Sequence, residues 1–288
     1  MDVLLGIGVA AGLGLADFFG GMSGRRTGPI RTITGVQVVG AVIIGSYVLA
    51  TRHTLGDTRT MLLAVLAGGA LTLGIGFMYT GFTWGRMGVV APVTAALIAV
   101  LTFGVGLVRG ERPSALALAG VGLAIVAVVL ISRPPQAEDA PAGGSETGKR
   151  FGLGAELGLS LAAGASLATF QSTIGEIGDA AGLAPLLVVR AAAIALSLLA
   201  LGVVWRRAGF PRLRVPRRST LVPVVASGFL LLVAHALLLE ALSLGLLSIV
   251  GPITALSPAF TVIPAWLFLH EHISRVQATA GLVLVALG

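Results

Sequence analysis

One stretch of this chain, residues 80–111, recurs 160 positions later as residues 240–271, with eight of the 32 aligned positions identical. Shared alanine, valine and leucine are common in apolar sequence. Shared proline and glutamate are uncommon there, because proline removes a backbone donor and a glutamate at the end of an apolar run must reach water or a partner. The identical pairs are Gly85/Gly245, Val90/Val250, Pro92/Pro252, Thr94/Thr254, Ala95/Ala255, Ala99/Ala259, Leu107/Leu267 and Glu111/Glu271. The chain therefore contains an internal duplication, and such repeats decide architecture.

The composition indicates an integral membrane protein. Of 288 residues, 56% are hydrophobic and only 11% are charged, whereas a soluble domain carries about 25% charged residues. The chain has no cysteine, which excludes disulfides, thiolate nucleophiles and cysteine-ligated metals. The net charge of +7 comes from arginines in short loops, a pattern that reports membrane topology and not nucleic-acid binding.

Ten apolar runs have about the length that crosses a bilayer, which is roughly 20 residues. They are Val3–Met22, Thr32–Ala50, Thr60–Trp84, Gly88–Val108, Pro113–Ser132, Gly152–Ile174, Leu183–Trp205, Leu221–Leu242, Leu246–Leu269 and Ser274–Gly288. Five precede and five follow one polar stretch rich in proline, glycine and acid, residues 133–151, which we expect to be a flexible extramembranous linker.

We therefore predict an all-α membrane protein of ten transmembrane helices, with one five-helix repeat in residues 1–132 (the first half) and another in residues 152–288 (the second half). Because five is odd, the second half enters the membrane from the opposite face, so the repeats are inverted. Many secondary transporters have this arrangement, with the substrate site at the repeat interface near mid-membrane.

The loop arginines and lysines predict an orientation. Loops after odd-numbered runs hold fourteen of them and loops after even-numbered runs hold four. By the positive-inside rule, this bias puts both termini outside the cytoplasm.

Several short motifs resemble the drug/metabolite transporter superfamily, specifically its ten-span proteins with two EamA-type repeats. They are Gly110-Glu111-Arg112 after the fourth run, Glu271 after the ninth, Pro92 and Pro258 inside those runs, and the stretch 241–271. The resemblance implies a secondary carrier that exports amino acids, other metabolites or drugs. It also implies cytoplasmic termini, against the arginine bias. The arginine often found in the family's second span is replaced here by Gln37, while its seventh-span counterpart corresponds to Arg190.

Polar side chains inside apolar runs are functional candidates, because burying them in a membrane is costly. We select as substrate-binding or coupling residues Asp17, Tyr79, Gln171, Arg190, His235, Glu240 and Ser257. Asp17 and Glu240 lie near the ends of their runs, where side chains can also extend to water. A buried ion pair between Arg190 and Glu240 is an alternative to a binding role for either.

His235 suits a proton relay, since an unperturbed histidine titrates near pH 6.5, but the favoured account is a hydrogen bond to a neighbouring helix. Pro252 and Pro258 bend the ninth run, so we expect a cavity wall or hinge there, with Pro92 as the counterpart in the fourth run. We expect Phe77, Phe82 and Trp84 in an interfacial belt, with Tyr79 alone deep enough to contact substrate. Glu111 and Glu271 are expected to cap loops or pair with nearby arginines.

The sequence has no phosphate-binding loop, metal-ligand spacing or nucleophilic triad, so we predict no catalysis, metal or cofactor. The favoured function is secondary transport of a small amino-acid-like or drug-like molecule across a bacterial inner membrane by alternating access, with export as the favoured direction. The expected partners are lipid, the cargo and H⁺ or Na⁺ as coupling ions, for a monomer or homodimer. A passive facilitator or exchanger, and an intramembrane enzyme or lipid-handling scaffold, are the alternatives.

Overall fold

The computed structural model describes residues 1–85, 87–115, 118–119, 122, 152–177, 182–208 and 218–261. Eight helices are assigned within these residues, and none of them forms a strand. In the first half they are α1 (Asp2–Thr27), α2 (Pro29–Thr51), α3 (Thr58–Trp84) and α4 (Met87–Val108). In the second half they are α6 (Leu153–Ile177), α7 (Pro185–Ala208), α8 (Arg218–Leu244) and α9 (Leu247–Thr254).

Six of these helices are long and apolar enough to cross a membrane: α1, α2, α3, α6, α7 and α8. They agree with six of the predicted runs. The fourth run is helical over α4, and the predicted fifth and tenth runs, like the linker, lie almost wholly outside the described residues. The chain is thus a multi-pass membrane protein, and its described secondary structure is all helical.

Local sequence sets the helix ends. Gly28, at φ 86°, separates α1 from α2, and Pro29 takes the first position of α2, where its missing N–H is no loss. Before α3, the Asp57 carboxylate accepts a hydrogen bond from Thr60 N at 2.8 Å. Hydrogen bonding by the Thr60 side chain, and then by its backbone N–H, lowers the pKa of Asp57. Only one to six residues separate α1 from α2, α2 from α3, α3 from α4 and α8 from α9.

The outer faces of the bundle carry large apolar side chains. Leu49 on α2, Leu62 on α3, Leu199 on α7 and Val222 on α8 are each more than 60% exposed. Water would disfavour so many exposed aliphatic groups, whereas lipid chains solvate them. These faces therefore fit contact with a bilayer.

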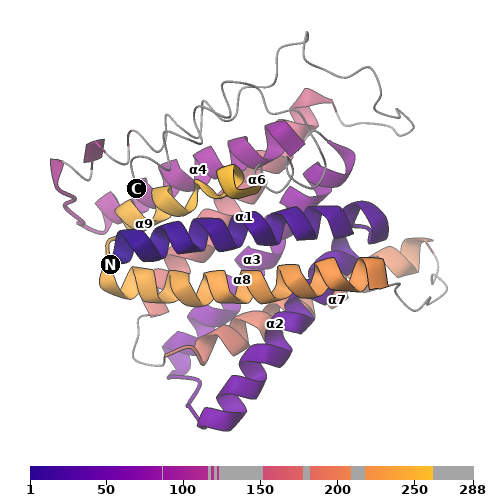
Figure 1. Ribbon diagram of the computed structural model, residues 1–288, viewed down its shortest axis with the longest axis horizontal. Coiled ribbons are helices and arrows are strands. Elements are labelled where there is room, and N and C mark those ends of the chain that lie inside the picture. The colour runs from indigo at the N-terminus through magenta and orange to yellow at the C-terminus, as the bar shows by residue number, and fades with distance from the viewer. Residues whose placement is uncertain are drawn as a thin grey trace.

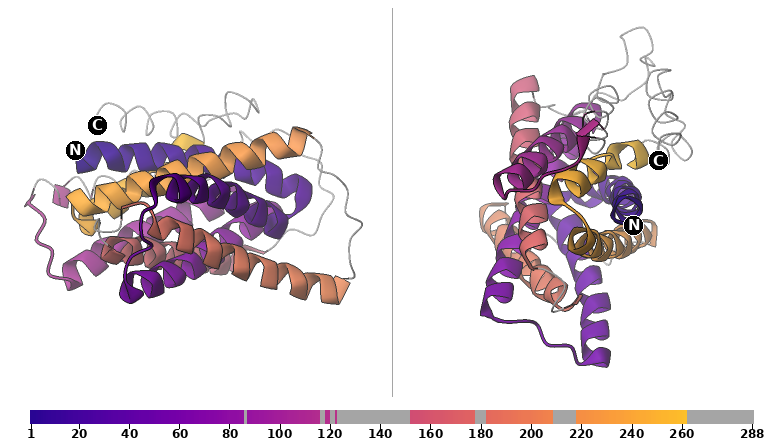
Figure 2. Two further views of the ribbon diagram at one scale, coloured as in Figure 1. Left: turned by 90° about the horizontal axis from the view of Figure 1, so that it is seen from below. Right: turned by 90° about the vertical axis from the view of Figure 1, so that its left-hand side faces the viewer.

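The most extensive packing joins helices from opposite halves. Helix α1 lies along α8, and α3 lies along α6; the first of these pairs crosses the front of Figure 1, with indigo α1 above orange α8. Helices α2 and α7 also pack together, and α4 packs on both α6 and α9. Figure 2 shows from two further sides that the colours of the two halves intermix. The halves therefore share one core.

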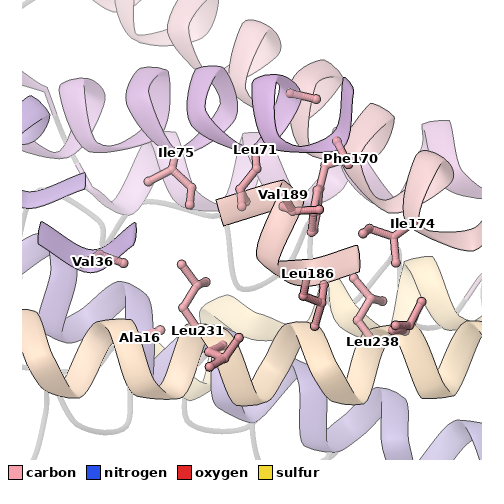
Figure 3. Close-up of a cluster of buried hydrophobic side chains, with 14 of the residues drawn as sticks. Ala16, Val36, Leu71, Ile75, Phe170, Ile174, Leu186, Val189, Leu231 and Leu238 are labelled. Atoms are coloured by element: carbon pink, nitrogen blue, oxygen red, sulfur yellow. The ribbon is translucent and has the colours of Figure 1, made fainter. Parts of the chain in front are cut away.

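That core is aliphatic. Leu71 and Ile75 of α3 face Leu231 and Leu238 of α8 across the interior, with Phe170 of α6 beside them (Figure 3). All five side chains are buried. The same interior surrounds the polar groups described below.

Glycines allow the backbones of the two halves to approach closely. A Cβ atom on Gly68 of α3 would stand 2.4 Å from the carbonyl oxygen of Val189 and 2.8 Å from the Ala192 side chain on α7. On Gly228 of α8 it would stand 2.9 Å from the carbonyl oxygen of Val36 and 2.7 Å from the Val39 side chain on α2. Small residues at such crossings are the usual means by which membrane helices associate.

We predict that Gly68→Ala lowers the unfolding free energy by about 1–3 kcal/mol, because the new methyl group would overlap a carbonyl that the helix cannot easily move. Gly69→Ala is the matched control, since a Cβ there meets nothing within 4 Å and alanine favours helix. Denaturant titration of both purified variants in detergent measures the difference. Equal stabilities for the two variants would contradict close packing at Gly68.

Candidate functional site

A cavity lies between the halves, enclosed by α1, α3 and α4 of the first and by α6, α8 and the α9 region of the second. The fourth and ninth runs, where the sequence predicts a cavity wall or hinge, both contribute to it. Its volume is about 60 Å³, enough for roughly four to six waters at about 10–15 Å³ each. The wall is mostly aliphatic and aromatic, and its polar members are Asp17, Thr94, Gln171, His235, Thr254, Ser257 and Thr261.

Five of the residues selected from sequence line this cavity: Asp17, Gln171, His235, Ser257 and Pro258. Tyr79 and Arg190 are buried behind the wall. Pro92 and Pro252 lie within α4 and α9, and Glu240 is exposed at the end of α8. The fold therefore gathers most of the selected polar groups at one place and leaves Glu240 away from it.

Arg190 is the largest fully buried side chain, at 0% exposure. Its Nη1 donates to Gln37 Oε1 on α2 at 2.5 Å, and its Nη2 lies 2.9 Å from His235 Nδ1 on α8. Gly40 of α2 makes room for it, because a Cβ there would stand 3.0 Å from Arg190 Nε. This cluster joins three helices of the two halves.

The alternative of an Arg190–Glu240 ion pair is wrong. Glu240 is exposed and makes no ion pair with any residue that the structure describes. Five residues separate it from His235, which turns it about 140° away on the helix. The favoured account of His235, a hydrogen bond to a neighbouring helix, is confirmed by its contact with Arg190. The ring of Phe170 packs against the imidazole with centroids 4.6 Å apart.

The ninth apolar run is a broken helix. α9 ends at Thr254, residues 255 and 256 form a turn, and helix resumes at Ser257 through Thr261. The break falls between Pro252 and Pro258, and Thr254, Ser257, Pro258 and Thr261 line the cavity. The described part of this run is thus interrupted between two of its prolines, and Pro258 lies in the cavity wall.

Gln171 of α6 is held against this broken helix. Its Nε2 donates to Thr254 Oγ1 at 3.0 Å, and the Thr254 hydroxyl stands 3.2 Å from Gln171 Oε1. Thr254 also donates to the carbonyl of Gly251. The pair can rearrange, because amide and hydroxyl each both donate and accept.

Asp17 lines the cavity from α1, ten residues before that helix ends, so it is not at a membrane surface. Tyr79 lies near Asp17 and packs against Gly20, where a Cβ would overlap its hydroxyl. Tyr79 is not among the lining residues, whereas Phe82, expected in the interfacial belt, is buried in the wall. The reason is that Phe82 belongs to the buried core cluster and not to the outer face of α3.

The sequence reasoning missed Thr94 and Thr254, which both line the cavity. The sequence did contain a signal for them, because Thr94 and Thr254 form one of the identical pairs of the duplication. Thr94 hydrogen-bonds the carbonyl of Ser160 on α6 at 3.3 Å.

One end of the cavity-forming bundle is tied by charged groups. The Glu111 carboxylate, after α4, accepts from the backbone N–H groups of Leu247 and Ser248 at 3.1 and 2.8 Å. Glu111 therefore caps the first turn of α9, in agreement with the expectation that it has a capping role. At the same end, Glu176 of α6 pairs with Arg59 at 3.0 Å and Arg109 at 3.2 Å. Glu271 lies outside the described residues.

Comparison with known protein families identifies the family of the second half. The EamA-like transporter family matches residues 153–288. This segment belongs to the EamA-like transporter family. The family resemblance inferred from sequence is thereby confirmed for the second half, and an EamA-like domain indicates a membrane transporter of small molecules.

A solved protein structure supports the same fold over nearly the whole chain. It superposes with a TM-score of 0.71 at 18% sequence identity, covering 97% of this chain and 93% of its own. At that identity the likeness concerns the fold alone. No curated protein matches the sequence. Within the residues described, no group of three histidine, aspartate or glutamate side chains could hold a metal ion.

We predict that Glu111→Gln destabilises the EamA-like domain by about 1 kcal/mol, because an amide replaces one of the two oxygens that cap α9. Glu240→Gln, which alters an exposed carboxylate elsewhere, is the matched control. Thermal unfolding in detergent, read by circular dichroism, compares the two. An unchanged midpoint for Glu111→Gln would show that the cap contributes nothing.

Proposed function

We propose that this protein is a secondary transporter that moves a small metabolite by alternating access of the central cavity. The observation that carries the proposal is the position of that cavity, enclosed by three helices of each half. A site at such an interface can open to either side when the halves rock against each other.

Matched packing contacts support the inverted repeat. Gly68 meets residues 189 and 192, while Gly228, its counterpart 160 positions later, meets residues 36 and 39. An offset of 153 relates the two contacted pairs. The two contacts therefore exchange when the halves are exchanged, as a two-fold axis between the halves requires. The pairing of α1 with α8 and of α3 with α6 follows the same exchange.

The charged links at one end support a closed gate on that side. Glu111 ties the segment after α4 to α9, and Glu176 ties α6 to Arg109 and Arg59. Opening the cavity toward this end would break bonds between the halves. Such exposed ion pairs are weak individually, about 0–1 kcal/mol, so a modest amount of cargo-binding energy can offset their loss.

The cavity constrains the cargo. A space of about 60 Å³ excludes anything much larger than a few waters, so binding requires α9 and its neighbours to move apart. The aliphatic wall with few polar groups fits a molecule with an apolar body and one or two polar groups. Amino-acid-like or drug-like cargo meets this description. Export across a bacterial inner membrane remains the favoured direction.

An intramembrane enzyme would need acidic and histidine side chains, here Asp17, His235 and Glu240, to converge at one depth. Asp17 and His235 share the cavity, but Glu240 is exposed at the end of α8, so the three do not converge. A facilitator or exchanger uses the same cavity and differs only in its coupling. Flux with and without an imposed ion gradient separates these modes.

We predict that proteoliposomes with the purified protein take up labelled leucine, or another small amino acid or cationic drug, faster than empty liposomes. A pH gradient should increase accumulation if H⁺ is the coupling ion, and a Na⁺ gradient if Na⁺ is. Ser257→Trp, which places an indole in the cavity wall, should abolish uptake without unfolding the protein. Folded protein that carries nothing in such a panel would count against the proposal.

We predict that single cysteines replacing His53 and Arg206 react with an impermeant maleimide from opposite faces of the membrane. These exposed positions lie just after α2 and in the last turn of α7, equivalent helix ends that inversion places on opposite sides. The natural chain has no cysteine, so no background labelling arises. Labelling of both from one face would rule out inverted repeats, and the face that reaches Arg206 gives the orientation.

A further inference from the structure

Arg190 is a buried cation that contacts no acidic side chain in the part of the chain that the structure describes. Its guanidinium touches Gln37 and His235, and it forms no ion pair with the residues described. Its Nε lacks a hydrogen-bond partner there too, as does Gln37 Nε2. An uncompensated charge in a membrane interior is costly and is a mark of function.

The contact with Arg190 decides the state of His235. A guanidinium only donates hydrogen bonds, so the imidazole Nδ1, 2.9 Å from Arg190 Nη2, must accept. The imidazole is then neutral and carries its proton on Nε2. His235 lines the cavity, and none of the described residues hydrogen-bonds Nε2. The cavity wall therefore offers an unused donor, backed by a positive charge.

We propose that His235 forms a subsite for a carboxylate group of the cargo, and that Arg190 is the positioning residue that keeps its imidazole a donor. This inference rests on the proposed transport function and names the chemistry of one part of its cargo. The Nε2–H would donate to a carboxylate oxygen, while the guanidinium behind it supplies the compensating charge. An ammonium group would be repelled at the same point.

The other polar groups leave this role to His235. Gln171 and Thr254 already bond to each other. Asp17, on α1, is the only acidic side chain among the described residues of the lining. A carboxylate would therefore bind at the His235 wall, and a cargo that also carries an amine finds Asp17 in the same cavity. The two walls have opposite electrostatic character.

The duplication shows that this subsite belongs to the second half alone. The offsets of 153 and 160 that relate the matched contacts make Gln37 the counterpart of Arg190 and Ile75 the counterpart of His235. Ile75 lines the cavity but has no polar atom. The two counterparts Gln37 and Arg190 bond directly to each other, so the asymmetry is concentrated at the point where the halves meet.

The tautomer can be measured without knowing the cargo. Nitrogen NMR of protein labelled with ¹⁵N-histidine should show one ring with its proton fixed on Nε2, and His235→Gln should remove that signal from among the four histidines. Titration with 4-methylpentanoate should shift the Nε2 resonance, whereas isoamylamine should not. A proton on Nδ1, or a shift with the amine alone, would overturn the proposal, as would no shift with either compound.

Variants test whether Arg190 acts through His235. Binding of L-leucine, L-leucinamide, 4-methylpentanoate and isoamylamine should be compared by the same NMR titration and by competition. His235→Leu and Arg190→Gln should weaken binding of the two carboxylates on the order of 10- to 100-fold, the loss of one charged hydrogen bond, with changes below about threefold for the amide and amine. His235→Gln should restore most of the affinity, because its amide can donate from near the Nε2 position.

Ser197→Ala is the matched control, since Ser197 is buried on α7 and bonds only within its helix. Equal losses for all four compounds, or equal effects of His235→Gln and His235→Leu, would mean that the cluster is structural and would refute the subsite. Should Arg190→Gln not fold, the wild-type tautomer and the two His235 variants still decide. Uptake of some compound without carboxylate selectivity would refute this inference while leaving the transport function intact. Selective binding of the carboxylates without uptake would support the subsite and refute the transport function.

Discussion

Close contact between backbones of opposite halves is the constraint on which this structure depends. In lipid, apolar side chains gain nothing by leaving their solvent, so the helices must associate through close packing and polar contacts. Gly68 and Gly228 provide that packing where α3 meets α7 and α8 meets α2. Gly14 and Gly164 do the same against the α9 region and α4, where added Cβ atoms would meet the carbonyls of Ser257 and Thr94. Each half is thereby packed mainly on the other.

The buried polar groups follow the same plan. Arg190 bonds across the halves to Gln37, and Ser227 of α8 donates to the Ala16 carbonyl of α1 at 2.8 Å. Thr261 donates to the Gly14 carbonyl at 3.0 Å, and Glu111 caps α9. Hydrogen bonds between the halves stabilise one arrangement of the two halves, but they can be exchanged for other hydrogen bonds in a second arrangement. A continuous aliphatic interface offers no such exchange. A transporter needs both properties, and the cavity lies where these bonds surround it.

Much of the fold follows from sequence because run length and hydropathy alone determine a membrane helix. The six long helices and the proline-broken ninth run were predictable for this reason. The partners of the buried charges were not predictable. Arg190 contacts His235 because of how α7 and α8 are rotated about their axes, which sequence does not give. Glu240 was selected from its depth in the membrane alone, without knowing which way its side chain points. Phe82 was misplaced for the same reason. The Thr94/Thr254 identity was readable, yet a threonine in an apolar run often bonds only its own helix, so chemistry alone did not single it out.

The central claim is that the two halves rock about the cavity, and distances at both ends test it most directly. The cysteine-free chain permits spin-label pairs at Val108 and Leu244 at the end capped by Glu111, and at Arg25 and Arg206 at the other, all exposed positions. Double electron–electron resonance in liposomes, before and after addition of a transported compound, should show one distance lengthen as the other shortens. Two unchanged distances, or two that lengthen together, would contradict the account.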